Sequence, residues 1–150
     1  MIEKHILEQY TDMQEEHKDI LRRIRRIEDQ IAKMEESGYT VADSVACGKK
    51  GKKAIKTVKV EGFPHPDYER KRALLRRYKA KLKLFEEELL EKQIEVEEYI
   101  QSIEDSRIRR IMRYRYLDNL TWQQVAHRMG KHHTAEGCRS AHDRFLGIKK

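Results

Sequence analysis

The chain has 150 residues, of which 39% are charged and 38% hydrophobic, and its formal net charge is +7. With only 2 Pro and 7 Gly it is neither collagen-like nor a Pro/Gly-rich disordered chain, and no apolar run approaches the roughly 20 residues of a membrane span. The charged first ten residues do not resemble a secretory signal, and two distant cysteines fit a reducing compartment, so we expect a cytoplasmic protein built from long amphipathic helices.

Residues 3–36 are predicted to form one long helix. Apolar side chains recur at steps of four and three from Ile6 to Met34, with His17 as a polar interruption. A heptad pattern sustained for about four repeats favours a coiled coil. Gly38 is suited to end the helix.

Residues 38–66 are interpreted as a basic loop, with six lysines against two acidic residues. Residues 40–45 and 55–60 contain β-type side chains, which permit a small β-hairpin. The Gly-containing segment carries Lys49, Lys50, Lys52 and Lys53. These lysines belong either to an arm that contacts phosphates or to a solvated loop. The run Phe63-Pro64-His65-Pro66 predicts an extended chain before the next helix.

Asp67 is expected to cap a second long helix that reaches Ile103. Its apolar residues from Leu75 onward again step by three and four, its first half is basic and its middle is acidic. Neither helix buries its apolar stripe alone, which predicts an antiparallel helical hairpin over residues 1–103 that also pairs with a second copy. His17 and Tyr78 are expected to be packing residues.

Residues 104–150 are predicted to form a compact three-helix domain. Its first helix covers residues 104–116, with Ile108, Ile111 and Met112 facing inward. Thr121 and Gln124 have the spacing of a capping box for the second helix. That helix is expected to bury residues spaced i, i+3, i+4 and i+7: Trp122, Val125, Ala126 and Met129.

The third helix follows a short turn after Gly130 and is expected to be capped by Thr134. Its predicted inner face is Cys138, Ala141, His142 and Phe145. Two short helices joined by a turn, the second with a polar outer face, are typical of a helix-turn-helix. The fold class expected is therefore all-α, a coiled-coil hairpin followed by a helix-turn-helix domain.

The segment from Arg107 to Leu146 resembles the region 4 helix-turn-helix of bacterial sigma factors. It is most similar to the phage and prophage RinA/ArpU-like late transcription regulators, which carry that module alone. The matching residues are Tyr114, Arg115, Tyr116, Leu120, Trp122, Val125, Ala126 and Gly130, followed by a T-x3-C-R run from Thr134 to Arg139. The resemblance covers about the last forty residues, and it implies contact with host RNA polymerase.

The side chains needed to read DNA are present around the third helix. Arg139 can bond guanine through two atoms, Glu136 can accept from cytosine, and Ser140 suits either base. The predicted base-reading set is Glu136, Arg139, Ser140 and Asp143. The predicted phosphate-contacting set is Gln123, Arg128, Lys131, His132, His133, Thr134 and Arg144. Since residues 104–150 hold eleven basic against five acidic side chains, a polyanionic partner is favoured.

The sequence gives less support to zinc binding or to enzyme activity. Cys138 and His142 are spaced i, i+4 like a zinc ligand pair, but the same positions belong to the predicted core. GxSxG, HExxH and a phosphate-binding GxxxxGK[ST] motif are absent from the sequence. We therefore expect no enzyme activity, no metal and no cofactor.

The sequence thus predicts a DNA-binding transcription regulator of phage or prophage type. Double-stranded DNA is the expected partner, and a homo-oligomer, with a dimer favoured, is expected through the coiled coil. Two alternatives remain open, a DNA-packaging protein similar to small terminase subunits and a coiled-coil interaction protein that binds no DNA.

Overall fold

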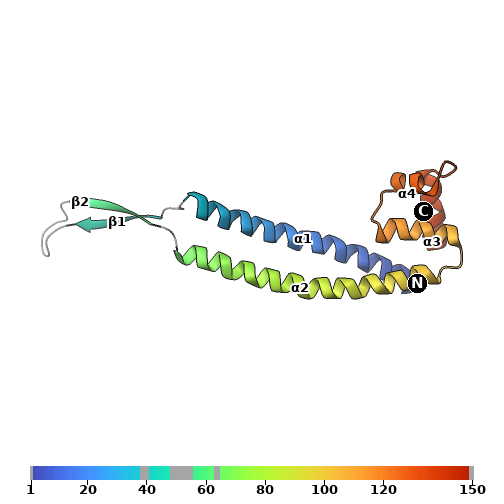
Figure 1. The fold of residues 1–150 in the computed structure, drawn as a ribbon, viewed down its shortest axis with the longest axis horizontal. Coiled ribbons are helices and arrows are strands. Elements are labelled where there is room, and N and C mark those ends of the chain that lie inside the picture. The colour runs from blue at the N-terminus through green and yellow to red at the C-terminus, as the bar shows by residue number, and fades with distance from the viewer. Residues whose placement is uncertain (1, 38–40, 48–55, 63–64, 149–150) are drawn as a thin grey trace. The chain divides into compact units, whose positions relative to one another are not determined.

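The computed structural model describes residues 2–37, 41–47, 56–62 and 65–148 (Figure 1). In chain order the elements are α1 (Ile2–Ser37), β1 (Val41–Cys47), β2 (Lys56–Gly62), α2 (His65–Ser102), α3 (Ser106–Met112), the π-helical turn η1 (Arg113–Leu117), α4 (Trp122–Met129) and α5 (Ala135–Phe145). They fall into two compact units, Met1–Lys18 with Leu84–Lys150, and Asp19–Lys83. None of the described helices is both long and apolar enough to cross a membrane.

In the unit Asp19–Lys83, the two long helices lie antiparallel. Lys79 Nζ is 2.9 Å from Glu28 Oε1, and the Tyr68 hydroxyl donates to Glu35 over 2.5 Å, so later residues of α1 meet earlier residues of α2. The buried seam of α1 consists of residues predicted from the heptad pattern: Ile20, Ile24, Ile27, Ile31 and Met34. The packing of the first helix on the second is thus confirmed.

The strands β1 and β2 form an antiparallel pair, with Val41 opposite Gly62 and Cys47 opposite Lys56. The β-type residues on each side of the Gly/Lys segment permitted this hairpin. The remaining described elements are helical, so the helical fold class is confirmed apart from these strands. The four lysines suggested as a phosphate arm, Lys49, Lys50, Lys52 and Lys53, lie outside the described residues.

The start of α2 corrects one prediction. The helix begins at His65 rather than after Asp67, with Pro66 in its first turn. Proline is tolerated there because the first backbone N–H groups of a helix have no intrahelical acceptor. Asp67 therefore lies inside the first turn, where its carboxylate is favourable to the helix dipole and lies 3.6 Å from Arg70 Nη1.

The other unit has a core whose buried residues come from α1, the end of α2 and α3. Leu7 and Tyr10 of α1 pack with the end of α2 and with α3; the remaining buried members are Val96, Ile100, Ile103, Ile108 and Met112. Near this core His17 Nε2 lies 2.8 Å from Glu86 Oε1, so α1 and α2 are antiparallel here as well. Leu7, which is fully buried, lies outside the predicted heptad positions.

Candidate nucleic-acid interface

Hydrogen bonds from capping residues explain where the short helices begin. Asp105 caps α3 by accepting from the backbone N–H groups of Arg107 and Ile108. Thr121 and Gln124 form the predicted capping box of α4, with each side chain bonded to the other residue's backbone N–H. The buried side chains of α3 and α4 include Ile111, Val125, Ala126 and Met129, as predicted.

The predicted first short helix is shorter than expected. Instead of covering residues 104–116, α3 ends at Met112 and the chain continues as the π-helical turn η1. The Asp118 N–H donates to Arg113 O over 3.1 Å, the i to i+5 pattern of a π-turn. The half-buried Tyr116 lies in this turn and packs against the core shared with α1 and α2.

Five residues, 130–134, separate α4 from α5. Gly130 has φ 116° and ψ 177°, a conformation that strongly favours glycine. Thr134 caps α5 because its Oγ1 accepts from the Gly137 N–H over 3.0 Å. Gly137 is also closely approached, since a Cβ there would lie 2.9 Å from Thr134 Oγ1.

The inner face of α5 is confirmed in part. Cys138 is fully buried and His142 is 5% exposed, as predicted, and Ala141 is half-buried. Phe145 was predicted to be inside but is 43% exposed. The side chain that packs inward at this end is Leu146, because it continues the Cys138–His142 line by another four residues. Trp122, predicted to be buried, is only half-buried.

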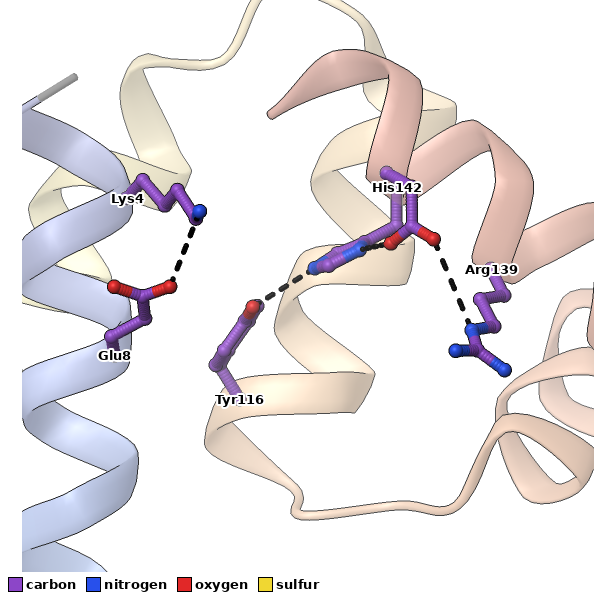
Figure 2. A network of polar contacts seen from close by, with 6 residues as sticks. Lys4, Glu8, Tyr116, Arg139 and His142 are labelled. Carbon is purple, nitrogen blue, oxygen red and sulfur yellow. Dashed lines mark hydrogen bonds and ion pairs between the residues drawn. The ribbon is translucent and has the colours of Figure 1, made fainter. Parts of the chain in front are cut away.

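Figure 2 shows the polar network that joins this inner face to the flank of α5. The Tyr116 hydroxyl lies 2.9 Å from His142 Nε2, and His142 Nδ1 lies 2.9 Å from Asp143 Oδ1. Both contacts are satisfied when the neutral imidazole donates to Asp143 and accepts from Tyr116. The other Asp143 oxygen is 3.9 Å from Arg139 Nε.

Burial sets the protonation states in this network. Desolvation lowers the pKa of His142, although its hydrogen bond to Asp143 opposes this shift. Desolvation also raises the pKa of Tyr116 to about 12, with nearby Arg115 opposing the shift. The network therefore consists of a neutral phenol and a neutral imidazole beside a carboxylate. Trp122 contacts the imidazole edge-on, with ring centroids 5.0 Å apart.

The predicted base-reading residues divide into two groups. Glu136 and Arg139 are exposed and Ser140 is half-buried. Glu136 and Ser140 lie on the side of α5 away from its buried residues, whereas Arg139 lies on the flank that also carries Asp143. The Arg139 side chain is 56% exposed, so its long contact with Asp143 leaves most of the guanidinium open. Asp143 is different, because its side chain is only 18% exposed and is bonded to His142.

The predicted phosphate-contacting residues also differ in availability. Gln123, Lys131, His132 and Arg144 are exposed. Arg128 pairs with Asp118 over 2.8 Å and lies over the Tyr114 ring, and Thr134 uses its hydroxyl as the α5 cap. His133 is half-buried, and its Nδ1 is buried without a hydrogen-bond partner in the described part of the chain.

A cavity of about 650 Å³ lies between the flank of α5 and the start of α1. Arg139, Asp143 and Trp122 line one side of it, and acidic residues of α1 line the other: Glu8, Asp12 and Glu15. Lys4 lies 3.4 Å from Glu8 on the same helix (Figure 2). Arg139 thus lies beside an acidic wall, whereas Glu136, Ser140 and Arg144 do not line the cavity.

Two interactions at the site were missed at the sequence level. The Arg115 guanidinium donates to Leu120 O over 2.9 Å and lies 5.0 Å from the centre of the Trp122 ring, so it holds the connection between η1 and α4. The guanidinium groups of Arg110 and Arg128 lie 5.8 Å and 5.5 Å from the centre of the Tyr114 ring. Arginines alternating with aromatic residues before a helix cap were the available signal.

The candidate zinc ligands are both engaged in packing or hydrogen bonds. The Cys138 side chain lies in the core formed by α3, α4 and α5, and burial raises the pKa of its thiol. Both ring nitrogens of His142 have hydrogen-bond partners. Among the described residues, no group of three or more His, Cys, Asp or Glu side chains is placed to hold a metal ion.

Comparison with known proteins finds no family model, curated protein or solved structure that matches this chain.

Proposed function

We propose that this protein is a sequence-specific DNA-binding transcription regulator of phage or prophage type. In this proposal α5 enters the major groove of double-stranded DNA and the helical hairpin joins copies of the chain. The observation that supports it most is the asymmetry of α5. One face is fixed to α3 and α4 through Cys138 and His142, while Glu136, Arg139 and Arg144 remain exposed.

The exposed side chains have complementary roles in such a complex. Arg139 reads a guanine through two hydrogen bonds, and Glu136 and Ser140 contact neighbouring base edges. Lys131 and Arg144 contact phosphates on either side, which sets the register without reading sequence. Contact with RNA polymerase also belongs to the proposal, and it rests only on the resemblance to sigma region 4.

The test is selection of bound sequences from a random DNA pool by the full chain, followed by titration of the enriched sequence and of random DNA. Arg139→Lys keeps the charge but loses the planar two-point donor. We expect it to weaken binding to the enriched sequence by about tenfold, within the roughly 1–3 kcal/mol of one base contact, with little effect on random DNA. Lys131→Ala is expected to weaken both and to reduce the salt dependence.

Two results would contradict the proposal. Failure of the native chain to retain DNA at micromolar concentration and moderate salt would favour a coiled-coil interaction protein. If the chain enriches a motif but native mass spectrometry shows a ring-shaped oligomer, a DNA-packaging protein would be favoured. Equal losses on specific and random DNA with Arg139→Lys would remove Arg139 from base reading.

A further inference from the structure

Helix α2 carries an exposed line of residues spaced seven apart. The line consists of Arg70, Arg77, Leu84, Glu91 and Glu98, all of them exposed. Residues at seven-residue spacing lie on the same face of a helix, within a small drift that supercoiling removes. Leu84, in the middle of the line, is 63% exposed, the highest value among the large hydrophobic side chains that the structure describes.

This line is separate from the face of α2 that packs on α1. The seam residues Leu82, Leu89 and Val96 are half-buried or buried and lie roughly two-fifths of a turn around the helix from the line. Ile94, which is 48% exposed, flanks the line on its own helix. The pairing with α1 therefore leaves this second face uncovered as far as Glu91, whereas Ile94 and Glu98 line an open cavity of about 550 Å³ together with Arg113 and Leu117 of η1.

The charges on the line are largely unused within the chain. In the described part of the molecule, no ion pair involves Arg77, Glu91 or Glu98, and the only partner of Arg70 is Asp67 on the same helix at 3.6 Å. The residues around the line are also basic before Leu84 and acidic after it. Residues 70–83 hold eight basic and no acidic side chains, whereas residues 86–98 hold seven glutamates and one lysine.

We propose that this line is the interface at which α2 pairs, antiparallel, with α2 of a second copy of the chain. Pairing centred on Leu84 places Arg70 opposite Glu98 and Arg77 opposite Glu91 of the second copy. Leu84 then meets its own counterpart. The adjacent line has Lys81 before the centre and Glu88 and Glu95 after it, with Leu74 and Asp67 nearer the start of the helix. Parallel pairing would instead oppose like charges along the whole line.

The order of residues identifies the partner as a second copy. A twofold interface uses the same patch on both subunits, so residue i meets j and j meets i. A line that is basic before one central leucine and acidic after it satisfies this condition with itself. The inference names the face used for the oligomerisation included in the proposed function, and it rests on that part alone. Its test contains no DNA, so its failure is distinguishable from failure of DNA binding.

The experiment is sedimentation equilibrium of the full chain at low salt, with two charge-reversal variants. We expect the native chain to be a dimer. Arg70→Glu with Arg77→Glu creates four Glu–Glu pairs in the homodimer contact, and Glu91→Arg with Glu98→Arg creates four Arg–Arg pairs. Each variant alone is expected to raise the dimer dissociation constant at least tenfold. Mixed in equal amounts, the two variants restore every opposite-charge pair, so we expect a heterodimer close to native in affinity.

Matched controls separate the interface from general charge effects. Arg76 and Glu97 are exposed on α2 but lie off the line, so Arg76→Glu and Glu97→Arg are expected to change the dissociation constant less than twofold. Circular dichroism establishes that each variant is helical. A native monomer at 100-fold the concentration used for DNA binding would overturn the inference. A dimer whose dissociation constant is unchanged by the two double charge reversals would also overturn it. So would an equal mixture of the two variants that fails to form a heterodimer.

Discussion

At the scale of single residues, His142 links the buried side of α5 to its exposed flank. It is a buried imidazole with a partner on each nitrogen, Tyr116 on one side and Asp143 on the other. A histidine satisfied in this way is stable in its neutral form, because a second ring proton would face the Tyr116 hydroxyl in a desolvated site. The stability of the packing around His142 is therefore expected to depend on pH.

The lowered pKa of His142 predicts the sign of a pH dependence. In the unfolded chain the pKa of this imidazole is near 6.5, and in the folded chain it is lower. Below pH 6.5 the unfolded state therefore binds a proton more readily than the folded state does. The His142 contribution to stability is present above about pH 6.5 and is lost as the pH falls. We expect His142→Gln to be less stable than the native chain at pH 7.5 and to lose less further stability between pH 7.5 and 5.5.

Urea denaturation at several pH values measures this difference. His127→Gln is the matched control, since His127 is exposed on α4 and its loss should leave the pH dependence nearly native. An identical slope for the native chain and His142→Gln would contradict the role assigned to His142.

Residue-level prediction succeeded where a side chain's position follows from its own helix. The burial of Cys138, Val125 and Met129 follows from helical spacing alone. Phe145 fails the same rule, because the inward line of α5 runs from Cys138 through His142 to Leu146 and the helix ends there. The Tyr116–His142 contact joins residues 26 positions apart, so no local pattern shows it.

At the scale of elements, α4 depends on one cap at its start and one glycine at its end. The Thr121–Gln124 capping box satisfies backbone donors at the start of α4. Removal of an N-cap hydroxyl costs roughly 0.5–2 kcal/mol. We expect Thr121→Ala to lower the free energy of unfolding by about 1 kcal/mol, and Thr121→Ser to leave it nearly unchanged, as measured by chemical denaturation.

Gly130 makes a second prediction at this scale. An added Cβ would meet nothing within 4 Å, so the cost of Gly130→Ala arises only from its backbone angles, φ 116° and ψ 177°. Such strain costs on the order of 1–3 kcal/mol. We expect Gly130→Ala to be destabilised by this amount, and the amide NMR signals of residues 131–134 to shift most. A neutral effect on stability would show that the turn relaxes into another conformation.

Element boundaries were predictable where the cause is local. Thr121, Gly130 and Thr134 mark the ends of α4 and the start of α5 through their own chemistry. The start of α2 was misplaced because Pro66 serves equally in an extended segment and in a first helical turn. The π-turn η1 was missed because its wide hydrogen bond accompanies packing of Tyr116 on another part of the chain.

At the scale of the whole molecule, the unit with the DNA-binding candidate helices is stabilised by residues from both ends of the chain. Leu7 of α1 is fully buried against residues of α2 and α3. Truncating a buried leucine costs about 2–5 kcal/mol. We expect Leu7→Ala to lower stability by this amount and to raise amide hydrogen exchange in α3 as well as in α1.

Leu21 is the matched control, since it lies on the same helix and is 39% exposed. Leu21→Ala is expected to change the free energy of unfolding by about 0.5 kcal/mol or less. Loss of stability in α1 without faster exchange in α3 would contradict a shared core.

Whole-molecule organisation was the hardest part to predict. Heptad spacing predicted one apolar stripe on α1, but Leu7 lies beside that stripe and is buried against residues that follow it by about 90 positions or more, from Val96 to Met112. For the same reason no pattern within α1 shows that Glu8, Asp12 and Glu15 line a cavity beside Arg139. Such arrangements depend on contacts distant in sequence.

The complete burial of Cys138 makes this chain suited to kinetic labelling. Its thiol lies where α3, α4 and α5 meet, and burial holds it in the protonated, unreactive form. A maleimide therefore reacts with Cys138 only when these helices separate. In a Cys47→Ser background, the alkylation rate would report how often the three-helix core opens, without any added fluorophore or isotope.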